Sequence, residues 1–125
     1  MYWVRKYLSV EYKDMNCSKF VEYVLRDHFK KDYSFPQSEG TVFAQSAQIK
    51  ANVPMFCEKT ESPKEGDLVL MHGIRRLCHV GMYLESNGIQ YGLHGEKNMG
   101  CSAVHRAKDL IRYGYSIEGF YTWVK

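Results

Sequence analysis

The chain changes its hydrophobic periodicity once along its length, and this change limits the folds that it can adopt. The first periodic segment has the i, i+3, i+4 spacing of a half-buried helix beginning near Cys17, with apolar positions at Phe20, Val21, Val24, Leu25 and Phe29. Residues 41–52 could form a second, shorter helix. After a turn cluster, "TESPKEG", period-two patterns and short apolar runs predict strands at Asp67–His72, Cys78–Leu84, Ile89–His94, Cys101–Ala107 and Ser116–Val124. Helices followed by strands predict an α+β domain in which the first helix packs on an antiparallel sheet of five to six strands.

Length and charge exclude several classes of protein. The 125 residues fit one domain, 1–125, whose single core needs no disulfide support. The formal net charge is only +3, and Lys and Arg are spread along the chain, which argues against a nucleic-acid partner. No 18-residue apolar segment occurs, so membrane insertion is not expected.

The N-terminal segment, "MYWVRKYLSVEYK", lacks the apolar run of a signal peptide. We therefore expect synthesis in the cytoplasm. Action in the periplasm or cell wall would require delivery by a complex, a virion or cell lysis. The widely spaced cysteines are expected to be free thiols in a reducing compartment: Cys17, Cys57, Cys78 and Cys101.

Cys17 is the one cysteine at a predicted helix start, with Asp14 and Asn16 as candidate N-cap residues. The unpaired N–H groups and the dipole of a helix N-terminus stabilise a thiolate, so we expect the pKa of this thiol to lie below its usual ~8.5. The N–H groups of Cys17 and Ser18 could also hold the oxyanion of a tetrahedral intermediate. The alternative is that Cys17 is a small apolar core residue, the more frequent role of a cysteine on an apolar helix face.

Two histidines lie on neighbouring predicted strands, His79 in "CHVGMYL" and His94 in "YGLHG". Side chains of adjacent strands can meet on one face, where His79 is joined by Gly81 and Tyr83. Gly81 is expected to leave open space there for a substrate. A helix-start cysteine with two strand histidines matches the needs of acyl transfer: a nucleophile, a base and a group that orients the base.

Four pieces in order, "DMNCSKFVEYVL", "SPKEGDLVLM", "CHVGMYL" and "YGLHG", resemble the motifs of the NlpC-type cell-wall cysteine peptidases. The resemblance implies a papain-like fold in which Cys17 is the nucleophile, His79 the general base and His94 the residue that orients it. It places Tyr12 on the oxyanion side beside Ser18. The implied reaction is hydrolysis of peptidoglycan stem peptides, at the bond between γ-D-glutamate and a diamino acid, with no metal or other cofactor. The small size also resembles members found in phage tails, which implies tail proteins as partners and a virion or lysis role.

The sequence departs from the family pattern at Asn16, where the family usually has Asp, and at Lys19, where it often has Gly. These departures affect the expected substrate more than the chemistry. Lys19 could reach the cleft and favour an acidic stem peptide, or it could be a solvated surface lysine.

Three alternatives remain open from the sequence. Cys17, His79 and His94 would make a Cys-His-His set that zinc accepts with an open fourth position, although no close-spaced ligand pair supports it. The chain could instead be an inactive tail or adaptor module, or could transfer acyl groups to an amine or act on an amide outside peptidoglycan. The remaining histidines, His28, His72 and His105, are interpreted as structural or surface residues.

Overall fold

A six-stranded antiparallel sheet forms the centre of the fold in the computed structural model, which describes residues 2–36 and 41–124. The strand order is β1-β6-β2-β3-β4-β5. The α+β architecture predicted from the sequence is confirmed. The elements are the 3-10 helices η1 (Tyr2–Tyr7), η2 (Ile74–Arg76) and η3 (Ala107–Tyr113), the helices α1 (Cys17–Asp27) and α2 (Val42–Phe56), and the strands β1 (Cys57–Thr60), β2 (Leu68–His72), β3 (Cys78–Ser86), β4 (Ile89–Glu96), β5 (Cys101–Arg106) and β6 (Ser116–Trp123).

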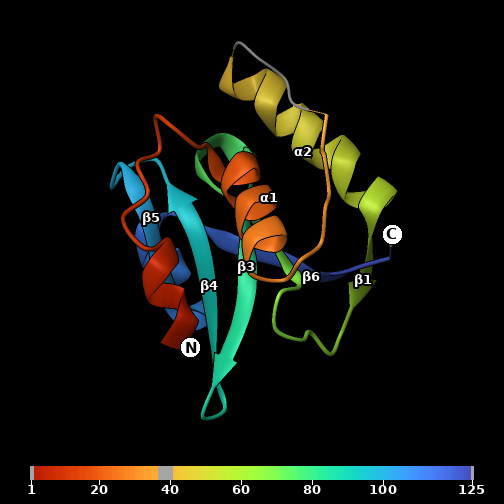
Figure 1. Cartoon of the computed structure of the whole chain (residues 1–125). Helices are drawn as coiled ribbons and strands as arrows, with labels where there is room; N and C mark the ends of the chain where they lie inside the picture. Colours follow the sequence, from red (N-terminus) through yellow and green to blue (C-terminus); the bar gives the residue numbers. More distant parts are fainter. Residues whose placement is uncertain (1, 37–40, 125) are drawn as a thin grey trace.

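Helix α1 lies across one face of the sheet, in front of β3 and β4 (Figure 1). It begins at Cys17 because the side chain of Asn16 accepts a hydrogen bond of 3.0 Å from the backbone N–H of Lys19, which confirms one of the two predicted N-cap residues. The buried side of the helix carries the predicted apolar positions up to Leu25, and Phe29 lies beyond its end. These side chains pack on β3 and β4 at Val80, Met82, Leu84 and Leu93.

Two elements extend the sequence prediction. Helix α2 continues to Phe56, past Pro54 and four residues beyond the predicted segment 41–52. Strand β1 was not predicted. It has only four residues, of which Cys57 alone is buried, so it carries no period-two pattern, and it forms because the far end of β6 offers a pairing edge at Trp123.

The alternation predicted for β3 is confirmed. Val80 and Met82 join the core beneath α1, whereas Tyr83 belongs to a second core on the opposite face with Leu110 and Tyr115. The space expected at Gly81 is not there. A Cβ atom at Gly81 would lie 3.0 Å from Cβ of His94 and 3.2 Å from Cε of Met71, so Gly81 allows the close approach of β4 and leaves no room for a substrate.

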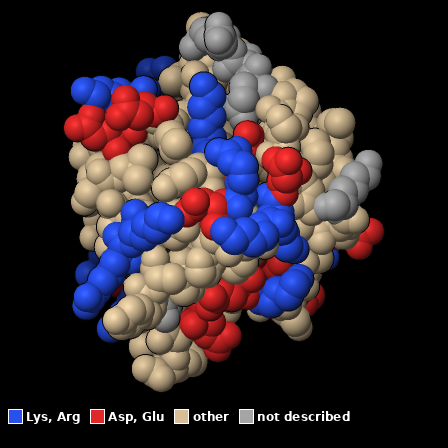
Figure 2. Space-filling model, in the orientation of Figure 1, with Lys and Arg blue, Asp and Glu red and all other residues tan. Residues whose placement is uncertain are grey.

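Charges on the surface are mixed. On the face shown in Figure 2, Lys and Arg side chains are interspersed with Asp and Glu and form no field of one sign. None of the helices in the described residues is long and apolar enough to cross a bilayer.

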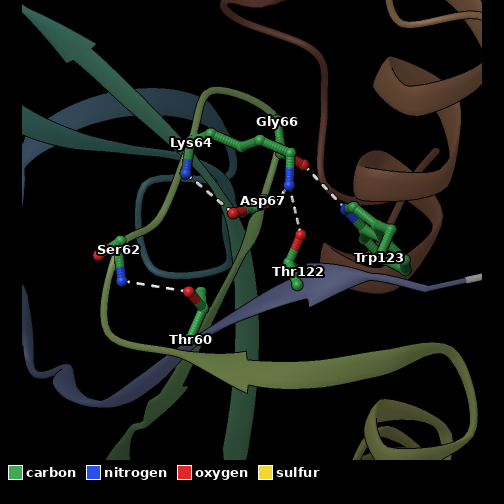
Figure 3. A network of polar contacts seen from close by, with 7 residues as sticks. All are labelled: Thr60, Ser62, Lys64, Gly66, Asp67, Thr122 and Trp123. Atoms are coloured by element: carbon green, nitrogen blue, oxygen red, sulfur yellow. Dashed lines mark hydrogen bonds and ion pairs between the residues drawn. The ribbon is translucent and has the colours of Figure 1, made fainter.

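A buried aspartate, Asp67, lies in a network that ties the turn before β2 to the neighbouring strand β6 (Figure 3). Its carboxylate accepts hydrogen bonds from the backbone N–H of Lys64 at 2.9 Å and from Nζ of the same residue at 3.2 Å. Nζ of Lys64 also donates to Thr122 on β6, and the indole N–H of Trp123 donates to the carbonyl of Gly66 at 2.8 Å. This network holds the "GDLV" segment at the start of β2 against β6.

Replacing Asp67 by Ala should lower the free energy of unfolding by about 1–3 kcal/mol, because the hydrogen bonds that its buried carboxylate accepts from Lys64 would be lost. Urea unfolding followed by circular dichroism measures the change. Glu11→Ala is the matched control, because its ion pair with Lys13 is exposed and its loss should change stability by less than about 0.5 kcal/mol. Equal effects of the two substitutions would contradict a structural role for the Asp67 network.

Candidate active site

Cys17 lies at the first position of α1 and is only 6% exposed. Burial raises the pKa of its thiol, and hydrogen bonds from the backbone of Val80 and from the backbone and hydroxyl of Ser18 oppose the rise without cancelling it. The lowered pKa expected from the helix start is therefore wrong for the protein without substrate. Desolvation outweighs the helix N-terminus, and the resting group is a neutral thiol.

Tyr12 and Ser18 both lie next to the thiol. The pKa of Tyr12 is raised to about 12, first by burial and then by the charge that Cys17 would carry, while the backbone N–H of Cys17 stabilises the phenolate and opposes the rise. The Tyr12 hydroxyl and the Cys17 N–H thus face the same small region. The structure therefore brings together Tyr12, which the family resemblance places on the oxyanion side, and the Cys17 N–H, which the predicted helix start places there.

The two predicted histidines meet in the interior, and a third extends them into a chain. A hydrogen bond of 2.8 Å joins Nε2 of His79 to Nδ1 of His94. A second, of 2.9 Å, joins Nε2 of His94 to Nδ1 of His105. We call these three residues the histidine chain. His79 is 7% exposed, His94 is fully buried and His105 is partly exposed.

His105 was expected to face solvent as a surface residue, and the structure places it in the chain instead. It pairs with Gly92 across β4 and β5, which sets it diagonally from His94 on the same face. The sequence contains both histidines but not the register of β4 and β5, which the turn between the two strands determines. A shift of one residue would have put the two side chains on opposite faces.

All three imidazoles are held neutral at neutral pH. Burial lowers the pKa of His79 well below 6.5, and the neighbouring His94 lowers it further. Burial and His105 lower the pKa of His94 to about 4, against the opposing charge of Glu96. Burial also lowers the pKa of His105, although Glu96 and Asp109 act in the other direction.

Tyr115 covers one face of the His79 ring. The two rings stack with centroids 4.3 Å apart and planes 17° apart. The Tyr115 hydroxyl donates to the buried carboxylate of Glu96, which also accepts the backbone N–H of Asn98 and of Met99 at 3.2 and 2.7 Å. Glu96 therefore holds the Tyr115 side chain in place, and Tyr115 limits the tilt of the His79 ring. Sequence reasoning missed both residues, because nothing in a tyrosine or glutamate pattern indicates stacking on a distant strand.

The thiol and the first histidine open into one pocket of about 240 Å³, which we call the Cys17 pocket. The start of α1, helix α2, η2, the start of β3, the turn after β4, the end of η3 and the segment just before β6 surround it. His94 is not among the lining residues and lies behind His79. The lining residues are Tyr12, Cys17, Val42, Gln45, Ser46, Ile49, Gly73, Ile74, Leu77, Cys78, His79, Lys97, Asn98, Tyr113, Gly114 and Tyr115.

The remaining sequence candidates are placed as follows. Lys19 does not line the Cys17 pocket, whereas Lys97 does, so the basic group of the cleft comes from the turn after β4. Within residues 2–36 and 41–124, no three His, Cys, Asp or Glu side chains are arranged to hold a metal ion, and the zinc alternative has no ligand group there.

Comparison with known proteins identifies one family. Residues 6–111, more than four fifths of the chain, match the family model described as the NlpC/P60 family. Cys17 and the whole histidine chain lie within the matched range. No curated protein and no solved structure matches the chain.

The buried His94 should make the protein less stable in acid. Its folded-state pKa of about 4 lies below the 6.5 of an unfolded histidine, so the unfolded chain binds more protons as the pH falls between these values. The contribution of this one residue to the loss should be roughly 3 kcal/mol. In His94→Gln the free energy of unfolding should therefore depend less steeply on pH over this range than in the wild type.

Urea unfolding at several pH values measures the two slopes. Ser102→Ala is the matched control, because it removes a buried polar side chain that does not titrate, and its slope should equal that of the wild type. Parallel curves for the wild type and His94→Gln would show that His94 is not buried in its neutral form.

Proposed function

Because this chain belongs to the NlpC/P60 family, we propose that it is a cysteine peptidase that hydrolyses an amide bond in the stem peptides of peptidoglycan. Members of this family are generally cysteine peptidases and act on peptidoglycan. The observation that carries the proposal for this chain is the Cys17 pocket, where the thiol, His79 and Tyr12 face one space.

His79 acts as the general base through Nδ1. Its Nε2 atom is engaged with His94, which leaves Nδ1 for the thiol proton. The Cys17 sulfur attacks the carbonyl carbon as this proton moves to His79, and the thioester forms when the carbon–nitrogen bond breaks. His79 returns the proton to the leaving amine. Water, deprotonated by the same nitrogen, then hydrolyses the thioester and restores the thiol.

The oxyanion of the tetrahedral intermediate is held by the backbone N–H of Cys17 and the hydroxyl of Tyr12. Both donors lie beside the sulfur, and burial has already removed most of the water from the Cys17 side. Donors held in place in a region of low dielectric stabilise a developing charge without reorganisation. The negative charge passes to the carbonyl oxygen as the Cys17 thiol loses its proton, so no free thiolate has to form. Stabilisation of that oxygen therefore compensates for the raised pKa of the thiol.

The charge of the pocket lining favours an anionic substrate. Apart from the reacting groups, Lys97 is the only Lys, Arg, Asp or Glu side chain among the lining residues of the described chain, and Lys97 forms no ion pair within that part of the chain. A stem peptide carries free carboxylates that this ammonium group would bind. Val42 and Ile74, which also line the pocket, offer apolar contact to the peptide. The charge of the pocket and the family resemblance together favour the bond between γ-D-glutamate and a diamino acid as the one that is cut. The resemblance alone suggests the setting, a phage tail or lysis component.

The test is hydrolysis of a defined stem peptide, followed by mass spectrometry of the products. The wild type should release the fragment ending in γ-D-glutamate, and Cys17→Ala should lower kcat/KM by at least about a thousandfold without loss of the folded state. Cys101→Ala, which changes a cysteine away from the pocket, is the matched control and should retain activity. A substrate with amidated carboxylates should show a raised KM.

Two outcomes would contradict the proposal. One is that the wild type cleaves no stem peptide, which would favour the adaptor alternative. The other is that Cys17→Ala remains active, which would assign the chemistry to another group.

A further inference from the structure

The histidine chain continues past the two residues that acyl transfer requires, and its last member reaches the surface. We infer that His105 receives, through His94, the proton that His79 removes from Cys17, so that the positive charge comes to rest at the solvent side of the chain. This inference rests on the proposed role of Cys17 and His79. It assigns to His105 a positioning and proton-holding role without contact to substrate.

When His79 is ready to act as a base, both hydrogen bonds of the histidine chain must be donated outward, from His79 to His94 and from His94 to His105. If Nδ1 of His79 is free to accept the thiol proton, Nε2 of the neutral ring carries the hydrogen and donates to Nδ1 of His94. Nε2 of His94 then carries a hydrogen and donates to Nδ1 of His105. With Nδ1 of His105 as the acceptor, His79 and His94 each carry their hydrogen on Nε2.

The same two hydrogen bonds carry the charge outward. After His79 takes the thiol proton at Nδ1, its Nε2 proton passes to Nδ1 of His94, and the Nε2 proton of His94 passes to Nδ1 of His105. His79 and His94 are then neutral, each with its hydrogen on Nδ1, and His105 is the cation with both nitrogens protonated. The two transfers run backward when His79 gives its Nδ1 proton to the leaving amine, so protons balance over the cycle.

The surroundings favour a cation at His105 over one at the inner rings. His94 is fully buried, whereas His105 is partly exposed, and a charge is less costly where water reaches it. Glu96 of β4 and Asp109 of η3 both act to raise the pKa of His105, against its burial, and Arg112 pairs with Asp109 at 3.9 Å.

Tyr113 of η3 lies flat on the His105 ring, with centroids 3.9 Å apart and planes 23° apart. An aromatic face stabilises a cation stacked on it. Because Tyr113 also lines the Cys17 pocket, the stack fixes His105 relative to the site.

The experiment is the rate at which iodoacetamide alkylates Cys17, mapped by mass spectrometry in the wild type and in His105→Gln. Glutamine retains an acceptor for His94 but cannot take up a proton. At pH 7 the variant should react about tenfold more slowly at Cys17. The deficit should shrink as the pH rises above 9.0 towards the raised pKa of the Cys17 thiol, because hydroxide then removes the proton directly. A purely structural role would lower the rate equally at both pH values.

Cys78 is the internal reference, because it lines the same pocket and reports access of the reagent. Its rate should be unchanged in His105→Gln, and His28→Gln, which changes a histidine stacked on Trp3 away from the pocket, should leave both rates unchanged. In His105→Ala, added imidazole should restore alkylation of Cys17 at pH 7, because the site is open to solvent at that end. Identical Cys17 rates for the wild type and His105→Gln at pH 7, or a deficit that stays the same as the pH rises above 9.0, would overturn the inference.

These rates require no peptide substrate, so they separate the inference from the proposed function. A chain that cleaves no stem peptide but shows the pH-dependent deficit would retain the relay and lose the proposed substrate. A chain that cleaves the peptide with no deficit would retain the function and lose the role of His105.

Discussion

The first turn of α1 lies directly on β4 at Gly95, and this contact determines how deeply the thiol is buried. A Cβ atom at Gly95 would lie 3.7 Å from Cα of Cys17 and 3.6 Å from Cβ of Phe20. These are ordinary van der Waals separations, so any side chain larger than alanine would push the helix away from the sheet. The neighbouring strand has a tighter contact at Gly81, where an added Cβ atom would lie only 3.0 Å from Cβ of His94. The two glycines together set the distance between helix, thiol and histidine chain.

Close packing has an electrostatic consequence. With little water at the site, the neutral forms of Cys17 and His79 are favoured over a thiolate–imidazolium pair, because burial moves the two pKa values in opposite directions. The same exclusion of water strengthens every hydrogen bond to a charge that develops during the reaction. In the proposed mechanism, such charges form beside the Tyr12 hydroxyl, the Cys17 N–H and the histidine chain. The resting site is therefore neutral but already has groups positioned to stabilise charge separation.

Sequence reasoning identifies what local pattern determines and misses what register and packing determine. The apolar stripe of α1 and its cap at Asn16 could be predicted because both lie within a few residues of one another. Strand β1 could not, because its pairing with Trp123 depends on an edge formed by residues distant in the chain. The place of His105 in the histidine chain was missed for the same reason. The raised pKa of Cys17 was missed because helix position can be read from sequence but burial depth cannot. The roles assigned to Cys17, His79 and His94 remain predictions that the geometry supports.

The central claim is that a neutral thiol gives its proton to a neutral, buried His79 during the attack. The dependence of kcat/KM on pH for stem-peptide hydrolysis tests it most directly. The account predicts that kcat/KM reaches half of its maximum at a pH below 6.5, where His79 loses its proton, and is constant from there to neutral pH and above. A rate that instead rises about tenfold per pH unit up to pH 9.0 would contradict the account, because hydroxide and not His79 would then be removing the thiol proton.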